Sequence, residues 1–388
     1  MYWANLLHIY QPPVQNKKIV DLIANECYYK IIEVLDANPD AKLTLNINAS
    51  LSELFEKYNH SDILEGLYEL CRRGNIELTT SGAYHPILPL LPYEMQIEQI
   101  KLNNEMNHKL IGNCFKPKGI FPPEMCYSKE LAKAAIREGC KWLIMDEVGI
   151  PDFVKPKPVY RLKDTQLYIV FRSRALSNAL NSVDIEEPKD FILMLPEINS
   201  EFAIVTATDG EIYGHHKKKF YKFLDRIFKL KGVQTITITE LIKLQSKSIE
   251  TIEPKLSSWA STEDELNCGI PYSRWFNRGN ELHLAQWLLT YRTINIAKDC
   301  KNKYAQIANK VPFSCQYYWA NPYLLWSPEM IEKGLKLHLK CLGILKQENK
   351  IEKDELKYLL KIAEYIRTRI RFYELKKSLQ LKPCSSPI

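Results

Sequence analysis

The stretch Phe202-Ala-Ile-Val-Thr-Ala-Thr208, followed at once by Asp209-Gly-Glu-Ile-Tyr-Gly214, is the most informative segment of the chain. Its first part is a short apolar run, which predicts a buried strand. Its second part places two carboxylates around a glycine where that strand ends, just before a helical pattern over residues 217–230. A buried strand, an acidic turn and a helix in this order are typical of parallel α/β proteins, which carry functional groups at the carboxyl ends of their strands.

The same alternation of apolar runs and amphipathic stretches fills residues 1–245. The predicted strands are Trp3–Ile9, Leu43–Asn48, Ile76–Thr79, Gly119–Phe121, Trp142–Asp146, Leu167–Phe171, Phe202–Thr206 and Thr235–Ile238, and the predicted helices include Ile19–Leu35, Ile63–Arg73, Glu94–Leu110, Lys129–Glu138 and Lys217–Leu230. This spacing favours parallel strands joined by crossover helices, and seven or eight such units fit a closed or nearly closed barrel better than an open sheet. A doubly wound sheet is the alternative, and the absence of a G-x-G-x-x-G loop weighs against its nucleotide-binding forms.

Composition changes after residue 245, which predicts a domain boundary. Residues 246–258 contain Lys, Ser, Thr and Pro and are interpreted as a linker. Apolar stripes at helical spacing follow over Leu282–Ala297, Met330–Leu345 and Glu355–Leu379. We therefore expect a catalytic barrel over 1–245 and a helical domain over 259–388 that contributes to the active-site cleft.

Charge and cysteine content limit the partners and the compartment. The 388 residues carry a net charge of +7, but the lysines are interleaved with 46 acids, so we expect no nucleic-acid partner. No uncharged run reaches the roughly 18 residues of a membrane span, and the amino terminus lacks the basic start of a signal peptide. The ten cysteines form no C-x-x-C pair, which favours reduced thiols and the cytoplasm. The oligomeric state stays open.

Two carboxylates stand where predicted strands end. Asp209 follows one strand, and Glu124 follows another and is preceded by two prolines that fix its backbone. Two acids brought to one barrel mouth by different strands are what glycoside hydrolysis needs, and a retaining enzyme holds them roughly 5 to 5.5 Å apart. The competing interpretation is that Asp209 and Glu211 only cap the next helix.

Two histidines also follow strands of the predicted barrel. His8 ends the first strand and His85 comes after the third, so both are expected to face the same mouth. A single histidine is more often a satisfied structural residue than a functional one. No H-x-x-H or H-x-x-x-H pair is present, so we expect neither a metal site nor another cofactor.

Four segments in order resemble glycoside hydrolase family 57. They are His8-Ile-Tyr-Gln-Pro12, Gly82-Ala-Tyr-His-Pro-Ile-Leu-Pro89, Pro123-Glu-Met-Cys-Tyr127 and Asp209-Gly-Glu-Ile-Tyr-Gly214. Weaker matches to the family occur at residues 171–177, 271–275 and 314–320. The resemblance implies a (β/α)7 TIM-like barrel followed by a C-terminal helical domain, and a retaining double displacement on α-linked glucans.

The resemblance also implies roles for individual residues. Glu124 would be the nucleophile and Asp209 the acid/base. The substrate would be contacted by His8, Tyr10, Gln11, His85 and Glu211, and by Trp319 from the helical domain. Both α-amylase-like hydrolysis and 4-α-glucanotransfer use this pair of acids, so the pair does not separate them.

The chain departs from the family pattern in ways that bear on substrate. Tyr10 replaces the second histidine of the first motif, Phe121 stands where many members have Trp, and Gln316 stands where some have Asp. The Tyr10 replacement keeps open a catalytically idle or carbohydrate-binding relative. A metal-dependent polysaccharide deacetylase, which would need an Asp and two His as ligands, is a further alternative without support from spacing.

Overall fold

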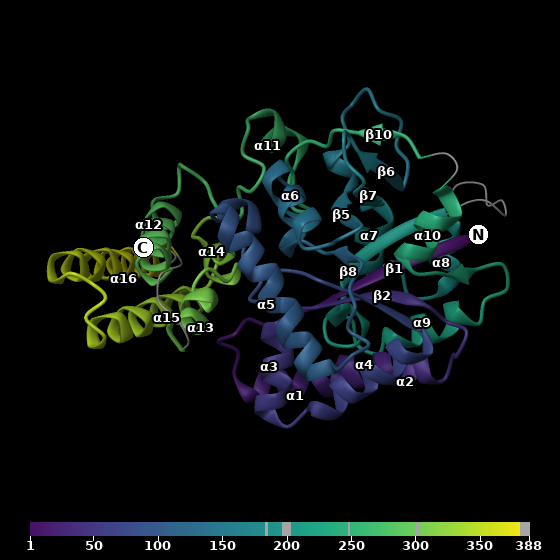
Figure 1. Cartoon of the computed structure of the whole chain (residues 1–388), viewed down its shortest axis with the longest axis horizontal. Coiled ribbons are helices and arrows are strands. Elements are labelled where there is room, and N and C mark those ends of the chain that lie inside the picture. The colour runs from purple at the N-terminus through teal and green to yellow at the C-terminus, as the bar shows by residue number, and fades with distance from the viewer. Residues whose placement is uncertain (183–184, 196–202, 247–248, 299–302, 381–388) are drawn as a thin grey trace, which may run out of the picture. The chain divides into compact units, whose positions relative to one another are not determined.

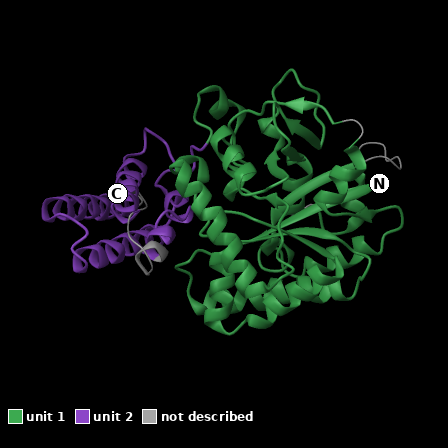
Figure 2. Ribbon diagram, in the orientation of Figure 1, with its two compact units in different colours: residues 1–271 green, residues 272–388 purple. Residues whose placement is uncertain are grey.

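The computed structural model of the chain describes residues 1–182, 185–195, 203–246, 249–298 and 303–380. Phe202, where the seventh predicted strand begins, lies outside these ranges. The chain forms two compact units, Met1–Pro271 and Tyr272–Ile388 (Figure 2). The sequence placed a linker at 246–258, whereas the division between the units falls later, after Pro271.

Seven parallel strands of the described residues form a ring in the first unit. They are β1 (Tyr2–Ile9), β2 (Leu43–Ile47), β3 (Ile76–Thr79), β4 (Gly119–Ile120), β5 (Trp142–Asp146), β7 (Tyr168–Arg172) and β8 (Ala203–Asp209). β1 pairs with β2 on one edge and with β8 on the other, β2 pairs with β3, and β5 pairs with β4 and β7. A bridge between Thr80 and Ile120 joins β3 to β4, and the Ser173 amide donates to Val205 O at 2.8 Å to join β7 to β8. The strand order therefore returns to β1, and the predicted (β/α)7 barrel is confirmed.

Three short strands add to this ring. β6 (Val159–Leu162) runs antiparallel to β7, β10 (Thr251–Ile252) runs parallel to β6, and β9 (Gln234–Thr235) pairs with the start of β1. The sequence did not predict β6 or β10, because β6 follows the loop-like run Lys-Pro-Lys-Pro and β10 is two residues long. β10 brings the chain back to the barrel after residue 248, so the residues that follow it belong to the first unit.

Helices cover the strands (Figure 1). They are α1 (Lys17–Ile23), α2 (Tyr29–Asp36), α3 (Ala49–Tyr58), α4 (Ser61–Arg73), α5 (Tyr93–Ile111), α6 (Lys129–Arg137), α7 (Arg174–Asn181), α8 (Pro188–Leu193), α9 (Tyr221–Phe228), α10 (Ile238–Gln245) and α11 (Glu263–Asn267), with a π-helical turn at Ala24–Tyr28 between α1 and α2. The predicted strand at Thr235–Ile238 is wrong beyond Thr235. Thr237 and Glu240 form a capping box that starts α10 instead.

The strands bury both of their faces. In β1, Trp3, Leu7 and Ile9 belong to the cluster under the outer helices, whereas Ala4 and Leu6 belong to the cluster inside the barrel. Because side chains alternate along a strand, His8 falls on the inner face with Ala4 and Leu6. This alternation explains why the strands are apolar nearly throughout and end in polar residues.

Gly119 of β4 offers a test of the barrel packing. A methyl group at this position would overlap the indole ring of the buried Trp142 on β5. We expect Gly119→Ala to lower the free energy of unfolding by about 1–3 kcal/mol or more, because the ring has no room to move. Urea unfolding would measure this. Gly343→Ala, where no atom lies within 4 Å of the added methyl, is the matched control and should not destabilise.

The second unit is helical. It contains α12 (Glu281–Ala297), α13 (Lys303–Lys310), α14 (Cys315–Tyr318), α15 (Pro328–Gln347) and α16 (Lys353–Gln380), with a small hairpin of β11 (Ala320–Asn321) and β12 (Leu325–Trp326). Three buried side chains tie it together: Thr290 Oγ1 lies 2.6 Å from the Tyr317 hydroxyl and 2.9 Å from His338 Nε2. Among the described residues, no helix is both long and apolar enough to cross a membrane.

Candidate active site

The inner faces of four strands end in polar side chains at one mouth of the barrel. Val205 and Ala207 belong to the inner cluster, so Asp209 follows on the same face of β8. The same alternation turns Asp146 of β5, Arg172 of β7 and His8 of β1 inward. Their parallel strands bring these four side chains to one end of the barrel, as the sequence predicted for His8 and Asp209.

Glu124 reaches this mouth from the turn after β4. Its backbone has a φ of 58°, in the left-handed region, and Met125 follows with a φ of 50°. For residues other than glycine this conformation costs on the order of 1–3 kcal/mol and clusters at functional sites. The Trp259 indole N–H donates to Glu124 Oε2 at 2.7 Å, and the Trp259 amide donates to Glu124 O at 3.1 Å. Side chain and backbone of Glu124 are thus both held by one residue.

Asp209 and Glu211, on either side of Gly210, differ in their hydrogen bonds. Gly210 between them packs on Ile9, where an added methyl would lie 2.5 Å from the isoleucine side chain. Glu211 is buried and accepts from the Tyr28 hydroxyl at 2.5 Å and from the Tyr10 amide at 3.3 Å. Asp209 makes no capping hydrogen bond to the turn that follows. The structure does not support the interpretation of Asp209 as a helix cap.

His8 and His85 meet inside the mouth. Their Nε2 atoms are 3.0 Å apart, and His8 Nδ1 lies 2.7 Å from Asn46 Oδ1. The Asn46 amide nitrogen donates to Thr79 Oγ1, so its oxygen faces His8, which must donate from Nδ1. Burial lowers the pKa of His8 to about 4 and lowers the pKa of His85 well below its usual value. Because His8 is neutral and carries its hydrogen on Nδ1, its Nε2 accepts a hydrogen bond from the Nε2–H of His85.

Tyr10 and Phe121 complete the wall around these histidines. The Tyr10 ring stacks on His85 with centroids 3.9 Å apart and planes 15° apart. The Phe121 ring stacks on His8 with centroids 4.4 Å apart and planes 14° apart. Gln11 is also buried here, and its amide lies 3.4 Å from the Tyr28 hydroxyl. Two of the departures from the family pattern, Tyr10 and Phe121, thus form one packed surface with the histidines.

The electrostatics of the mouth are set by three buried carboxyl groups. Burial raises the pKa of Glu124, Asp209 and Glu211, and the charge of Asp209 raises the pKa of the other two further. The Trp259 N–H opposes this shift at Glu124, and the Arg172 guanidinium opposes it at Asp209. Neighbouring acids of this kind titrate as a unit, and near neutral pH the group retains protons. One acid and one carboxylate can therefore coexist in the site.

The sequence did not identify three residues of this mouth. They are Trp259, Arg172 and Asp146. Trp259 directly follows residues 246–258, which were interpreted as a linker. A signal for the other two was available, because a charged residue that ends a buried strand needs a partner. Asp146 has two: its oxygens accept from Arg172 Nε at 2.8 Å and from Arg174 Nε at 2.7 Å.

Trp319 lies in the second unit, directly after α14. It is half-buried, its ring meets Tyr318 edge-on at 5.5 Å, and its carbonyl accepts from the Ser327 amide. Gln316 is buried in the same unit and donates to Phe313 O at 3.2 Å. Gln316 is therefore part of the packing of the second unit.

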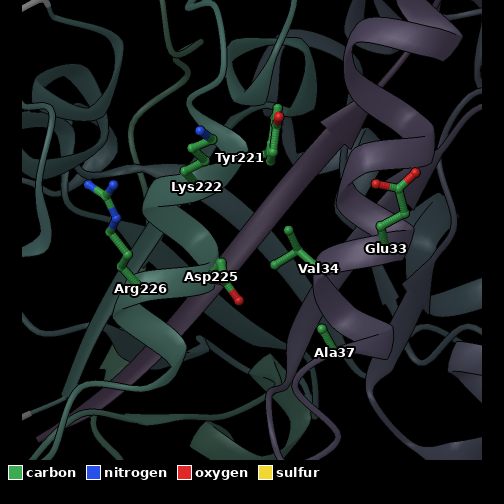
Figure 3. Close-up of a pocket in the computed structure, with 7 residues that line it drawn as sticks. All are labelled: Glu33, Val34, Ala37, Tyr221, Lys222, Asp225 and Arg226. Atoms are coloured by element: carbon green, nitrogen blue, oxygen red, sulfur yellow. The ribbon is translucent and has the colours of Figure 1, made fainter.

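A pocket of about 390 Å³ lies between α2 and α9 and is lined by Glu33, Val34, Ala37, Tyr221, Lys222, Asp225 and Arg226 (Figure 3). It is a groove between two outer helices and contains none of the predicted residues. No group of three or more His, Cys, Asp or Glu in the described ranges is arranged to hold a metal ion.

Comparison with known proteins places this arrangement in a family. An α-amylase of Pyrococcus horikoshii is 25% identical over 306 residues, which cover 70% of this chain and 48% of that protein. A 4-α-glucanotransferase of Thermococcus litoralis is 27% identical over 141 residues, 36% of this chain and 21% of that protein. The chain spans about half the length, or less, of these curated relatives.

Solved structures agree on the fold. A family 57-type branching enzyme of Pyrococcus horikoshii superimposes with a TM-score of 0.71 at 16% identity, over 94% of both chains. The model of Glycosyl hydrolase family 57 matches residues 5–255, which include Glu124, Asp209 and both histidines. The resemblance inferred from four short segments is confirmed, and the chain belongs to glycosyl hydrolase family 57.

Proposed function

We propose that the chain is a retaining glycosidase that acts on α-linked glucans. The observation that carries the proposal is that Glu124 and Asp209 reach one barrel mouth, where each carboxyl group has its own stabilising partner. The family membership and the names of the relatives, α-amylase and 4-α-glucanotransferase, support an oligo- or polysaccharide substrate. They do not favour a metal-dependent deacetylase.

In the first step, the Glu124 carboxylate attacks the anomeric carbon of the bound sugar. The bond to the leaving oxygen breaks, and Asp209 gives that oxygen its proton. In the second step, the Asp209 carboxylate takes a proton from water or from a sugar hydroxyl, which attacks the same carbon and releases Glu124. The Trp259 N–H favours the anionic Glu124 that the first step requires.

The remaining predicted residues are assigned to substrate binding. His8 and His85 would contact the sugar at the reacting position, and Tyr10, Gln11 and Glu211 would line the mouth beside them. Trp319 would approach the sugar from the second unit. The first unit, Met1–Pro271, would carry the catalytic groups, in a cytoplasmic protein without nucleic-acid or membrane partners.

Incubation with maltoheptaose tests the proposal. Products resolved by chain length against time should change in wild-type protein and stay unchanged in Glu124→Gln. Products shorter than seven units alone would indicate hydrolysis, and a ladder above seven would indicate transfer. No change with maltoheptaose or with an activated aryl α-glucoside would contradict the assignment to α-glucans and favour the idle relative.

A further inference from the structure

We propose that Asp146, Arg172 and Arg174 form a positioning clamp for the catalytic pair. The clamp fixes Trp259 against Glu124 and places one cation beside Asp209. This inference rests on the proposed function, because it assumes that Glu124 and Asp209 are the reacting groups. None of the three clamp residues needs to touch the substrate.

Asp146 is the centre of the clamp. Its side chain is fully buried at the end of β5, and it accepts hydrogen bonds from both arginines and from the Val148 amide at 3.0 Å. A buried carboxylate with three donors is firmly held, and it fixes the planes of both guanidinium groups. One acid and two cations leave the clamp with a net charge of +1.

Arg172 connects the clamp to the acid/base. Its Nη1 donates to Ala207 O at 2.7 Å, two residues before Asp209 on β8. This bond lies next to the backbone bond from the Ser173 amide to Val205 O that joins β7 to β8. The guanidinium carbon also lies 5.1 Å from the centre of the Trp259 ring, on whose face a cation is attracted. Arg172 thus acts on Asp209 directly and faces Trp259, the residue that holds Glu124.

Arg174 connects the clamp to the segment that carries Trp259. Its guanidinium donates to Ser261 O at 2.8 Å and to Trp259 O at 3.2 Å. The backbone amide of Arg174 donates to Glu147 Oε1 at 2.6 Å, and this bond fixes the backbone of Arg174. Trp259 is therefore held by its carbonyl, by the face of its ring, and by the two bonds that it gives to Glu124.

This arrangement matters because the mouth concentrates negative charge. The groups that face Glu124 are His85, whose Nδ1 is 3.9 Å away, the Trp259 indole and the Asp209 carboxyl. Asp209 faces Arg172, Glu124 and Glu211. Arg172 is the cation near this cluster, and both histidines are held neutral by burial. Without the Arg172 guanidinium, burial would raise the pKa of Asp209 further.

The first test removes one hydrogen bond. Trp259→Phe keeps a ring on Arg172 but loses the N–H at Glu124, so kcat should fall by about 10- to 100-fold, as for loss of a hydrogen bond to a charged group. KM should change little. Because the N–H lowers the pKa of Glu124, the acidic limb of the pH–rate profile should move to higher pH. Trp142→Phe, which loses an N–H bonded to Thr239 instead, is the matched control and should leave this limb in place.

The second test removes the cation. Arg172→Ala should lower kcat and move the basic limb to higher pH, because the guanidinium lowers the pKa of Asp209. Guanidinium ion added to Arg172→Ala at millimolar concentration should restore part of the rate. Arg172→Lys should leave the basic limb at its wild-type pH but recover only part of the wild-type kcat. Arg161→Ala, which removes a guanidinium stacked on Tyr168 away from the mouth, should show neither effect.

The outcomes separate the clamp from the proposed function. The clamp alone would be overturned if turnover is lost in Glu124→Gln, while Trp259→Phe keeps the wild-type kcat with an unshifted pH–rate profile and Arg172→Lys keeps the full wild-type kcat. An inactive wild type, or a fully active Glu124→Gln, would overturn the proposed function first. If Arg172→Ala does not fold, as circular dichroism would show, Trp259→Phe and Arg172→Lys still decide the question.

Discussion

Glu124→Gln is expected to lose turnover by a factor on the order of 10⁴ or more while it still binds the glucan. The amide has the shape of the carboxylate but cannot attack the anomeric carbon, so the first step of the double displacement stops. Its Oε1 can still accept the Trp259 N–H, which keeps the local structure in place. Product analysis with maltoheptaose gives the rate, and titration calorimetry gives the affinity.

Glu130→Gln is the matched control for this change. Glu130 lies six residues further along, in the first turn of α6, and its side chain is exposed. The control should retain the wild-type rate. Turnover of Glu124→Gln at that same rate would show that another group is the nucleophile.

Asp209→Asn is expected to have an effect that depends on the leaving group. General acid catalysis contributes about 10²- to 10⁴-fold, so the variant should lose activity in this range on maltooligosaccharides. An aryl α-glucoside with an acidic phenol needs little protonation, and its first step should be nearly preserved. Addition of azide, which attacks without general-base help, should then accelerate the second step.

Rates on the two substrates measure this dependence directly. Asp152→Asn is the control, because Asp152 is 87% exposed and pairs with Lys255 on the surface. An equal loss on every substrate, with no response to azide, would mean that Asp209 supports the structure of the mouth and does not transfer the proton.

The barrel was predictable from the sequence because two features identify most of its strands. Runs such as Trp142–Asp146 are buried on both faces and end in a polar residue, and an amphipathic helix of regular period follows most of them. β6 could not be recognised in this way, because it runs antiparallel to β7 and is preceded by prolines. The start of α10 was misjudged because Thr235-Ile-Thr-Ile-Thr is β-branched, although the Thr237–Glu240 capping box decides in favour of the helix.

The candidate site was predictable where it is local in sequence. His8, Glu124 and Asp209 each follow a strand, and the barrel alone then brings them together. Trp259 was not predictable, since its contact with Glu124 spans 135 residues and nothing in the surrounding serines and prolines marks it. The stack of Tyr10 on His85 also depends on tertiary structure, because the two rings come from the loops after β1 and β3, which are separated by β2 in the barrel.

The return of the chain through β10 determines which part of this protein can be transplanted. A fragment or chimera joined after residue 245 would carry both carboxylates and both histidines, but not the indole that holds Glu124. A junction after Pro271 would keep β10, Trp259 and the carbonyls bound by Arg174 with the barrel. Exchange of helical partners between related barrels, by engineering or by recombination, therefore has its natural crossover point after Pro271, about two dozen residues beyond the end of α10.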